Sequence, residues 1–337
     1  MRLTTDPAEA AAALAAGRLA GLPTETVYGL GGRADSPAAV ARIYAAKGRP
    51  ADHPLIVHVA SAEAAWQWAR QVPEHARRLA EAFWPGPLTI VLERSERAGD
   101  FVTGGQATVA VRVPAHAGMR AVIDELARLT GDPAIGIAAP SANRFGRVSP
   151  TTAAHVIDEL ADATSDDDVV LDGGASEVGV ESTIVDCTRE AAVLLRPGQV
   201  SADDIEQVTG SSLGVRTSVR APGMLASHYA PRARVLIVDE AALARMAQAA
   251  TTPATTPATA STAAPDTGLL ALDSVATPAG MVRLTAPATV DDYARGLYAA
   301  LREADALGLA TVLAVAPAEQ GIGAAVIDRL TRAAAGG

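Results

Sequence analysis

Residues 135–143 read Ile-Gly-Ile-Ala-Ala-Pro-Ser-Ala-Asn. The small and apolar residues from Ile135 to Ala139 predict a strand, and the polar residues Ser141 and Asn143 follow it directly. In open sheets covered by helices, ligands bind in the crevice outside the carboxyl ends of the strands. We therefore expect an α/β fold in which Ser141 and Asn143 contribute to a binding site, although a Ser or Asx turn would use the same residues.

Helix and strand signals alternate on both sides of this stretch up to residue 210. Capping residues stand before a proline or an acid at Asp6, Ser36, Ser149 and Ser201, and each predicts the start of a helix. With 135–139 there are about seven expected strands, which indicates a single α/β domain with a large sheet over residues 1–210. The other expected strands are 55–59, 88–92, 108–113, 169–171, 183–186 and 193–195.

The rest of the chain predicts a linker and a second domain. Residues 211–232 are rich in Ser, Gly and Pro and lack a sustained apolar period, which is typical of a linker. A smaller α/β domain is expected over 233–337, although 251–267 is almost entirely Thr, Ala and Pro and predicts a flexible insertion. Its expected strands are 235–238, 269–272, 281–284 and 311–315, and its last helix lies near 324–334.

The composition narrows the class of protein. The chain has 337 residues, of which 49% are hydrophobic and 3% aromatic, so we expect two domains with cores of Ala, Val, Leu and Ile. No apolar run approaches the ~20 residues that span a membrane, and the N-terminus does not read as a signal peptide. The single cysteine, Cys187, permits neither an internal disulfide nor a cysteine-rich zinc site. These features predict a cytoplasmic protein without membrane contact.

The net charge of −10 argues against a broad surface for nucleic acids, because such binding requires many Lys and Arg side chains. No direct high-affinity contact with nucleic acid is therefore expected, although a local basic pocket remains compatible with this charge. The motif G-x-x-x-x-G-K-[ST] is absent from the sequence, as are H-E-x-x-H and G-x-S-x-G. Phosphates are therefore not held by a Walker-type loop, and the commonest zinc protease and hydrolase motifs do not apply.

Other polar stretches could carry chemistry. The loop 23–31 combines hydroxyls, one carboxylate and glycines, and Lys47-Gly48-Arg49-Pro50 places two cations at the end of a predicted helix. The same residues suit a polar turn and an ordinary helix terminus. His58 and Arg112 alternate with apolar neighbours in two predicted strands, and Arg112 would suit a carboxylate ligand. Two further stretches, 179–183 and 195–198, add a hydroxyl, a carboxylate and another cation.

Taken together, these motifs resemble the YrdC-type threonylcarbamoyl-AMP synthases, and the linker and chain end resemble the long two-domain form of that family. The motifs that carry the resemblance are Pro23-Thr24-Glu25-Thr26-Val27-Tyr28-Gly29-Leu30, Lys47-x-Arg49-Pro50, His53-Pro54-Leu55-Ile56-Val57-His58, Trp84-Pro85-Gly86-Pro87-Leu88-Thr89, Val109-Ala110-Val111-Arg112, Ala139-Pro140-Ser141-Ala142-Asn143, Glu181-Ser182-Thr183-Ile184, Pro222-Gly223-Met224, His228-Tyr229-Ala230-Pro231 and Gly321-Ile322-Gly323-Ala324-Ala325.

The resemblance implies a YrdC-like twisted open sheet with helices, followed by a linker and a smaller Rossmann-like α/β domain. It further implies a nucleotidyltransferase that makes threonylcarbamoyl-AMP from L-threonine, bicarbonate or carbon dioxide, and ATP with magnesium. The product would pass to a tRNA-modifying threonylcarbamoyl transferase. Lys47 and Arg49 are the expected catalytic residues, and no residue is expected to bind a metal directly. The expected ATP-binding residues are Lys47, Arg49, Ser141, Asn143, Ser149, Arg196 and Tyr229, and the expected threonine-binding residues are Thr24, His58, Thr108, Arg112, Ala139 and Ser182.

Three other hypotheses compete with this interpretation. An RNA-binding module could use the same positive cavity without catalysis. An amidase could use Ser141 as the nucleophile with Lys47 as the base. A carbamoyl transferase would be similar to the related domains of hydrogenase maturation, but the accessory zinc and acylphosphatase segments are missing. The linker 211–232 is also expected to act as a lid, with Tyr229 sealing the nucleotide from water.

Overall fold

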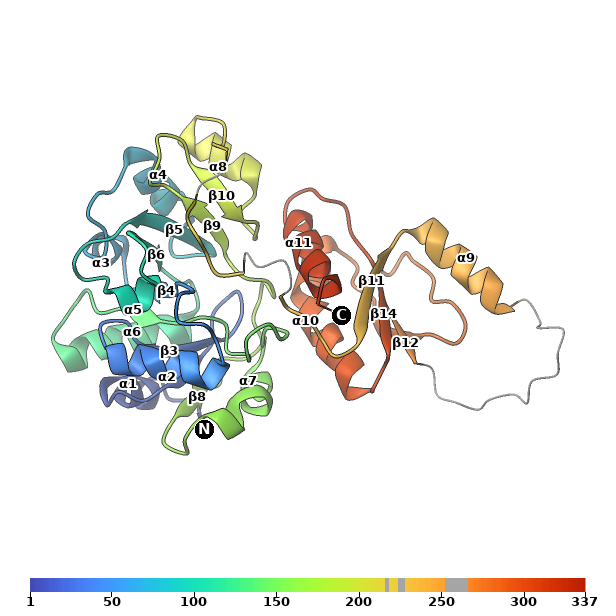
Figure 1. Ribbon diagram of the computed structural model, residues 1–337, viewed down its shortest axis with the longest axis horizontal. Helices are drawn as coiled ribbons and strands as arrows, with labels where there is room; N and C mark the ends of the chain where they lie inside the picture. The colour runs from blue at the N-terminus through green and yellow to red at the C-terminus, as the bar shows by residue number, and fades with distance from the viewer. Residues whose placement is uncertain (216–217, 224–227, 252–265, 337) are drawn as a thin grey trace. The chain divides into compact units, whose positions relative to one another are not determined.

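The computed structural model describes residues 1–215, 218–223, 228–251 and 266–336. The chain forms two compact units, each a sheet with helices, so the expected α/β class is confirmed (Figure 1). The N-terminal unit comprises Met1–Phe145 and Ser149–Met224, and the C-terminal unit comprises Gly146–Val148 and Leu225–Gly337. The expected functional residues before Tyr229 lie in the N-terminal unit.

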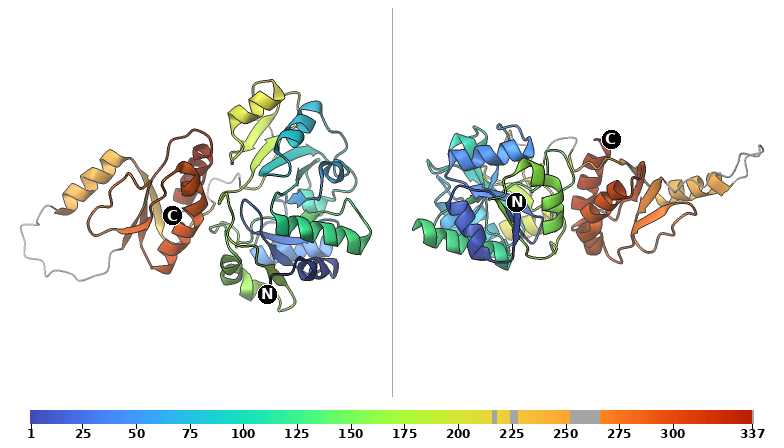
Figure 2. Two further views of the ribbon diagram at one scale, coloured as in Figure 1. Left: turned by 180° about the vertical axis from the view of Figure 1, so that it is seen from behind. Right: turned by 90° about the horizontal axis from the view of Figure 1, so that it is seen from below.

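A ten-stranded mixed sheet organises the N-terminal unit, in the order β1-β8-β2-β3-β7-β4-β6-β5-β9-β10. Helices pack against it (Figure 2). The strands are β1 (Arg2–Thr4), β2 (Ala20–Leu22), β3 (Gly29–Arg33), β4 (Ile56–His58), β5 (Leu88–Glu93), β6 (Thr108–Arg112), β7 (Ile137–Ala138), β8 (Val169–Leu171), β9 (Thr183–Asp186) and β10 (Val193–Arg196). The helices are α1 (Pro7–Ala15), α2 (Pro37–Lys47), α3 (Ala62–Trp66), α4 (Glu74–Phe83), α5 (Asp100–Thr103), α6 (Ala117–Thr130), α7 (Ala153–Leu160), a short 3-10 turn (Ala161–Ala163) and α8 (Ala202–Thr209).

All seven expected strands are present, but the sheet is larger than the sequence predicted. β3 has the sequence Gly-Leu-Gly-Gly-Arg, which lacks the β-branched residues and the alternation that signal a strand. It nevertheless pairs with β2 on one side and β7 on the other, so its glycines pack closely between neighbours. A side chain at Gly31 would meet Leu22 and Ile137. Tertiary pairing, rather than local preference, makes this segment a strand.

Helix capping was predicted correctly at three of four positions. Asp6, Ser36 and Ser201 each accept a hydrogen bond from a backbone amide in the first turn of α1, α2 and α8. The helix predicted at Ser149 is wrong, because α7 begins at Ala153 and its cap is Thr152. The hydroxyl of Ser149 is instead fully buried and donates to a carboxylate, as described below.

The pleat of the central strands separates two faces. In β4 and β6, Val57 and Val111 point into the main hydrophobic core, where helices cover the sheet. Ile56 and Ala110 belong to a smaller apolar cluster on the opposite face. Because side chains alternate along a strand, residues two positions further on share this second face. His58 and Arg112 are those residues, so the pleat directs both to the same side.

The C-terminal unit is built on a four-stranded parallel sheet in the order β11-β14-β12-β13. On one face, Leu243 of α9 packs with Leu269, Leu313 and Val315, while α10 and α11 lie on the other side (Figures 1 and 2). Residues 252–265, most of the predicted insertion, lie outside the described residues. The elements are β11 (Arg234–Val238), α9 (Glu240–Thr251), β12 (Thr267–Leu270), β13 (Val282–Thr285), α10 (Val290–Ala306), β14 (Thr311–Val315) and α11 (Gly323–Ala334).

None of the helices in the described residues could cross a membrane. The longest is α10, with 17 residues, and it carries the charged residues Asp291, Asp292 and Arg295. A membrane-spanning helix needs about 20 mostly apolar residues, so α10 is both too short and too polar.

Candidate active site

His58 and Arg112 lie next to each other on two parallel strands. β4 pairs with β6 so that His58 is the direct partner of Arg112. Both residues are 3% exposed and occupy the face that carries the smaller apolar cluster. An always-charged guanidinium this deeply buried requires fixed partners.

Arg112 has three such partners, which come from two separate loops. Its Nε atom donates to the carbonyl oxygen of Gly86 at 3.2 Å, and Nη1 donates to the hydroxyl of Thr26 at 3.0 Å. Its Nη2 atom donates to Oε1 of Glu25 at 2.6 Å, which forms a buried ion pair. Burial raises the pKa of Glu25, but the charge and hydrogen bond of Arg112 outweigh it and hold this pKa below its usual value. Glu25 is therefore ionised and balances the charge of Arg112.

His58 is neutral in the folded protein. Burial lowers its pKa to about 3, and the positive charge of Arg112 contributes to the same shift. Its Nδ1 atom is buried and has no hydrogen-bond partner among the described residues. The imidazole therefore offers neutral polar atoms beside the guanidinium and adds no charge to the site.

The loop that follows β2 is held by its own hydroxyl groups. Thr24 donates to the carbonyl oxygen of Val27 at 2.6 Å, and it accepts hydrogen bonds from the amides of Thr26 and Val27. Thr24, expected to bind threonine, thus serves first to shape the loop that presents Glu25 and Thr26 to Arg112. The composition of this loop also suits a simple polar turn, and the structure shows a turn that in addition supplies two partners of Arg112.

Lys47 ties the end of α2 to the loop after β7. Its Nζ atom donates to the carbonyl oxygen of Ser141 at 2.5 Å and to that of Asn143. Burial, followed by the charge of Arg49, holds the pKa of Lys47 well below its ordinary value. Lys47 contacts the carbonyl of Ser141 and not its hydroxyl, so this geometry disfavours the amidase hypothesis, in which Lys47 would activate that hydroxyl.

Arg49 lies just beyond the helix end. Gly48 adopts φ 61° and ends α2, which turns the chain so that Arg49 is buried next to Lys47. The Nη2 atom of Arg49 donates to the carbonyl oxygen of Pro54 at 3.0 Å, and its guanidinium lies 6.0 Å from the ring of Phe145. Gly48 therefore ends the helix in the ordinary way, and this turn also buries the two cations Lys47 and Arg49 side by side.

Ser149 and Glu181 form a third contact between distant motifs. The hydroxyl of Ser149 donates to Oε1 of Glu181 at 2.6 Å, and both residues are buried. The negative charge of Glu181 also acts on the pKa of Lys47, in the direction opposite to burial. Ser149 was expected near the nucleotide, and the structure places it beside a carboxylate that belongs to the surroundings of Lys47.

Ser182 connects the expected threonine residues with the expected nucleotide residues. Its hydroxyl lies 2.8 Å from that of Thr89 and accepts a hydrogen bond from Nη2 of Arg196 at 3.1 Å. Arg196 also donates from Nη1 to the carbonyl oxygen of Pro222 at 3.0 Å. One residue from each expected set and one linker residue therefore meet at this point.

Ala139 and Thr108, both expected to bind threonine, lie at the ends of two strands of the sheet. Ala139 is buried after β7, where its amide donates to the carbonyl oxygen of Ile56, so it lies beside β4. Thr108 stands at the start of β6, opposite Glu93 of β5. It lies four positions before Arg112, a distance of about 13 Å along an extended strand. The role of Thr108 toward threonine stays a prediction.

Tyr229 belongs to the C-terminal unit, where it is 1% exposed. It has φ 63°, which is unusual for a residue other than glycine. Its ring stacks on that of Tyr298 with centroids 5.7 Å apart, and the guanidinium of Arg329 lies 5.3 Å from its centre. The role of Tyr229 toward the nucleotide stays a prediction. Met224 of the linker motif lies outside the described residues.

The linker contacts the face of the sheet that carries His58 and Arg112. Ala221 is a member of the small apolar cluster with Ile56, Ala110 and two further strand residues. The neighbouring Arg220 forms an ion pair with Asp52 at 3.1 Å. Sequence reasoning gave no role to Glu25 and Gly86, nor any contact to Ala221, because these depend on pairings between distant segments.

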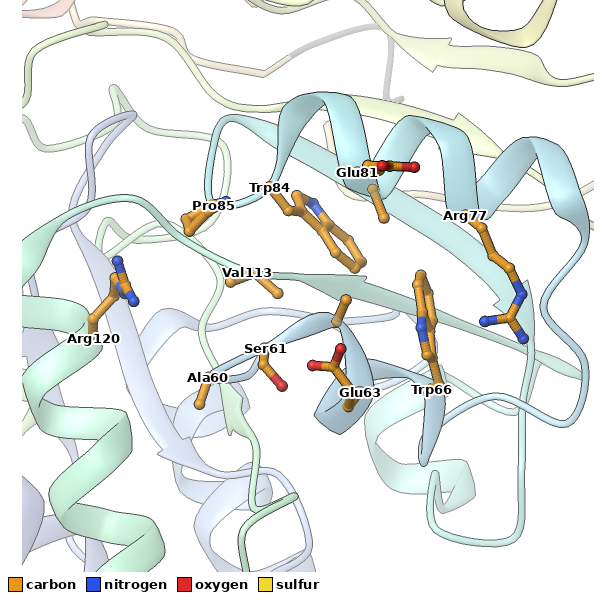
Figure 3. A pocket seen from close by; sticks show the side chains of 12 residues that line it. Ala60, Ser61, Glu63, Trp66, Arg77, Glu81, Trp84, Pro85, Val113 and Arg120 are labelled. Atoms are coloured by element: carbon orange, nitrogen blue, oxygen red, sulfur yellow. The ribbon is translucent and has the colours of Figure 1, made fainter.

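A cavity of about 420 Å³ lies near the end of β6, between residues of α3, α4 and α6 (Figure 3). Trp66 and Trp84 stack in it with centroids 5.5 Å apart, and the guanidinium of Arg77 lies 5.7 Å from the ring of Trp66. Val113 and Pro85 also line it, next to Arg112 and Gly86 in the chain. Its charged residues are of both signs, so the cavity does not favour one ligand charge. They are Glu63, Arg77, Glu81 and Arg120.

Metal ligands do not cluster in the part of the chain that the structure describes: no group of three or more His, Cys, Asp or Glu side chains could hold an ion there. The site instead contains buried cations with fixed partners. Arg112 lies with its partner Glu25 and the neutral His58, and Lys47 lies beside Arg49. Such a set suits an anionic substrate with several phosphates beside a smaller polar molecule.

Comparisons with known proteins show the family of the chain. The Sua5, YciO and YrdC family model, described as telomere recombination, matches residues 12–198, and the model described as threonylcarbamoyl-AMP synthase, C-terminal domain, matches residues 200–335. The threonylcarbamoyl-AMP synthase of Pyrococcus abyssi is 40% identical over 94% of this chain and 90% of its own length. That of Bacillus subtilis is 37% identical over 99% of this chain and 94% of its own length. The crystal structure of P. abyssi Sua5 complexed with L-threonine matches with a TM-score of 0.82 and 39% identity, over 98% of this chain and 94% of that one.

Proposed function

Because the chain belongs to the family of threonylcarbamoyl-AMP synthases, we propose that it joins L-threonine, bicarbonate or carbon dioxide, and ATP into threonylcarbamoyl-AMP. It is an enzyme, and this reaction would make it a nucleotidyltransferase. The product would serve the threonylcarbamoyl modification of tRNA through a downstream transferase. The relative crystallised with L-threonine supports the choice of amino acid.

The observation that carries this proposal is the contact between Ser182 and Arg196. Ser182 belongs to the expected threonine residues and Arg196 to the expected nucleotide residues. A reaction between threonine and ATP requires both molecules to be held within reach of each other. The hydrogen bond between these two side chains supports a single site with a threonine end and a nucleotide end.

The chemistry has two steps. The neutral amine of threonine forms a bond to the carbon of carbon dioxide, one C=O electron pair moves onto oxygen, and the nitrogen releases a proton to solvent water, which gives a carbamate. A carbamate oxygen then forms a bond to the α-phosphorus of ATP, the bond from that phosphorus to the bridging oxygen breaks, and pyrophosphate leaves. Negative charge spreads over the phosphate oxygens in this second step, so buried cations can stabilise it. Lys47, Arg49 and Arg196 are the proposed source of that stabilisation.

The residues present also fit magnesium that arrives with ATP. Magnesium usually keeps several waters and takes one or two carboxylates together with phosphate oxygens. The sequence led us to expect no direct metal ligand, but Glu181 is a buried carboxylate that acts on Lys47, and it is the residue that we propose would hold the ion. Bound magnesium would neutralise part of the phosphate charge. Ser149, which donates to Glu181, would keep the carboxylate oriented.

A direct product assay tests the function. Purified full-length protein is incubated with ATP, L-threonine and bicarbonate, and pyrophosphate and threonylcarbamoyl-AMP are measured by enzyme coupling and mass spectrometry. Pyrophosphate should appear only when all three substrates are present. Release of phosphate with ADP, or pyrophosphate release independent of threonine, would contradict the proposal.

Within the linker, residues 218–223 are proposed to act as a lid over the site. Ala221 packs on the sheet face of His58 and Arg112, and the carbonyl oxygen of Pro222 accepts from Arg196. A closed linker would exclude water from a product that hydrolyses easily. The variant Ala221→Asp places a charge against this apolar cluster and should raise the ratio of AMP to threonylcarbamoyl-AMP. An unchanged ratio would reject the lid.

A further inference from the structure

Glu25 carries an atom that its surroundings leave unsatisfied. The residue is 5% exposed, and its Oε1 atom is held by Arg112 at 2.6 Å. The other oxygen, Oε2, is buried and makes no hydrogen bond of ordinary geometry to the described residues, although the backbone of Glu25 and Ala115 helps to lower the pKa of this carboxylate. Leaving a charged acceptor of this kind unpaired is costly, so such an atom points to a ligand that supplies a donor.

Arg112 also has unused capacity at the same place. A guanidinium has five N–H donors, and Gly86, Thr26 and Glu25 take one donor each. With respect to the described residues, two donors therefore remain for an acceptor on the ligand. His58, the strand partner of Arg112, is neutral and does not change the charge balance.

The ion pair is thus complementary to an amino-acid zwitterion. We propose that Glu25 is a positioning residue for threonine: its Oε2 accepts a hydrogen bond from the α-ammonium while the remaining donors of Arg112 hold the α-carboxylate. This inference rests on the proposed function and extends it, because it names the group that recognises the amine. Glu181, the carboxylate that acts on Lys47, serves the nucleotide end instead.

Glu25 acts in binding and not as a proton acceptor. Because Arg112 stabilises its ionised form, the carboxylate holds the ammonium in place without removing the proton itself. The ammonium releases one proton to solvent water, and the neutral nitrogen then bonds to carbon dioxide as in the proposed reaction. Fixing the nitrogen in this way would select molecules that carry an amine beside the carboxylate.

Binding measurements can separate this role from a structural one. Calorimetry on the full-length protein compares L-threonine with 3-hydroxybutyrate, which has hydrogen in place of the ammonium. The readout is the ratio of the two dissociation constants. In Glu25→Gln the preference for threonine should fall by about 10-fold or more, the size expected for a hydrogen bond to a charged group. The matched control Glu93→Gln, at a partly exposed carboxylate paired with Arg70, should keep the wild-type ratio.

The outcomes are distinct. If Glu25→Gln weakens both ligands by the same factor, Glu25 only supports the fold around Arg112 and the proposal is overturned. If that variant does not fold, Glu25→Asp is measured in its place: it keeps the charge but shortens the reach, and its ratio must again fall. Suppose that the wild-type protein releases pyrophosphate and that the ratio of dissociation constants is unchanged in the variant: this result refutes the role of Glu25 alone. If the wild-type protein releases no threonine-dependent pyrophosphate, the proposed function itself is refuted.

Discussion

The Nζ atom of Lys47 lies 2.5 Å from the carbonyl oxygen of Ser141, although the two residues are 94 positions apart. The contact joins the last residue of α2 to the loop after β7. It buries an ammonium where two backbone carbonyls replace water as its partners. The proposed nucleotide end of the site is therefore created by packing a helix terminus against a strand-end loop.

Replacing Arg49 by alanine should abolish threonine-dependent release of pyrophosphate, a loss of at least about 100-fold in kcat. The physical reason is the removal of a buried cation next to the proposed phosphate position. The coupled pyrophosphate assay measures the effect. Arg70→Ala removes an exposed guanidinium paired with Glu93 and should retain normal activity. Normal turnover in Arg49→Ala would remove Arg49 from the site.

The affinity for ATP should fall as the pH rises, and this fall should begin at a pH below the ordinary pKa of lysine. The reason is that the pKa of Lys47 is lowered, so its ammonium loses its proton at a lower pH than a free lysine does. Burial, with the charge of Arg49, lowers the pKa of Lys47, while Glu159 and Glu181 act in the opposite direction. Loss of that proton removes a positive charge from the phosphate site. In Lys47→Arg the charge persists at all these pH values, so the alkaline decline should move upward. Calorimetry with ATP alone measures it, and the same decline in both proteins would contradict the assignment.

The stability of the fold should decrease as the pH falls from about 6.5 toward 3, and His58 should account for part of the loss. Burial lowers the pKa of His58 to about 3, so in this window the unfolded chain binds a proton that the native protein does not. Between these two pH values, His58 should lower the free energy of unfolding by an amount on the order of 5 kcal/mol.

Denaturant unfolding at about pH 7.5 and about pH 4.5, on either side of the ordinary histidine value, tests this contribution. His58→Gln lacks the titrating group, so the difference in unfolding free energy between the two pH values should be smaller than in the wild type. His116→Gln, at a partly exposed histidine, is the matched control. Equal differences in wild type and His58→Gln would show that His58 is not buried as a neutral group.

The thiol of Cys187 should not react in the native protein. It is fully buried, and burial together with the charge of Asp186 raises its pKa. A thiol reagent such as Ellman's reagent should therefore label Cys187 only after addition of denaturant. Stoichiometric labelling of the native protein at neutral pH would contradict the burial of this residue.

The parts of the site that follow from local pattern were predictable. The capping residues Asp6, Ser36 and Ser201 correctly predict the helices that follow them, because a cap contacts only the first turn of its own helix. The alternation in β4 and β6 correctly separates His58 and Arg112 from their core-facing neighbours. Ser149 shows the limit of such rules: its hydroxyl donates to Glu181, 32 positions away, instead of capping a helix.

By itself, the sequence determined the α/β class, the helix that ends at Lys47 and the family to which the motifs belong. These depend on periodicity, caps and residue order, all of which are short-range properties. Only the tertiary structure decided that Glu25 neutralises Arg112, that Lys47 binds the carbonyls of Ser141 and Asn143, and that Ala221 covers the sheet. Each of these is a contact between distant segments, and it exists because the folded chain must satisfy buried charges and apolar surface at once.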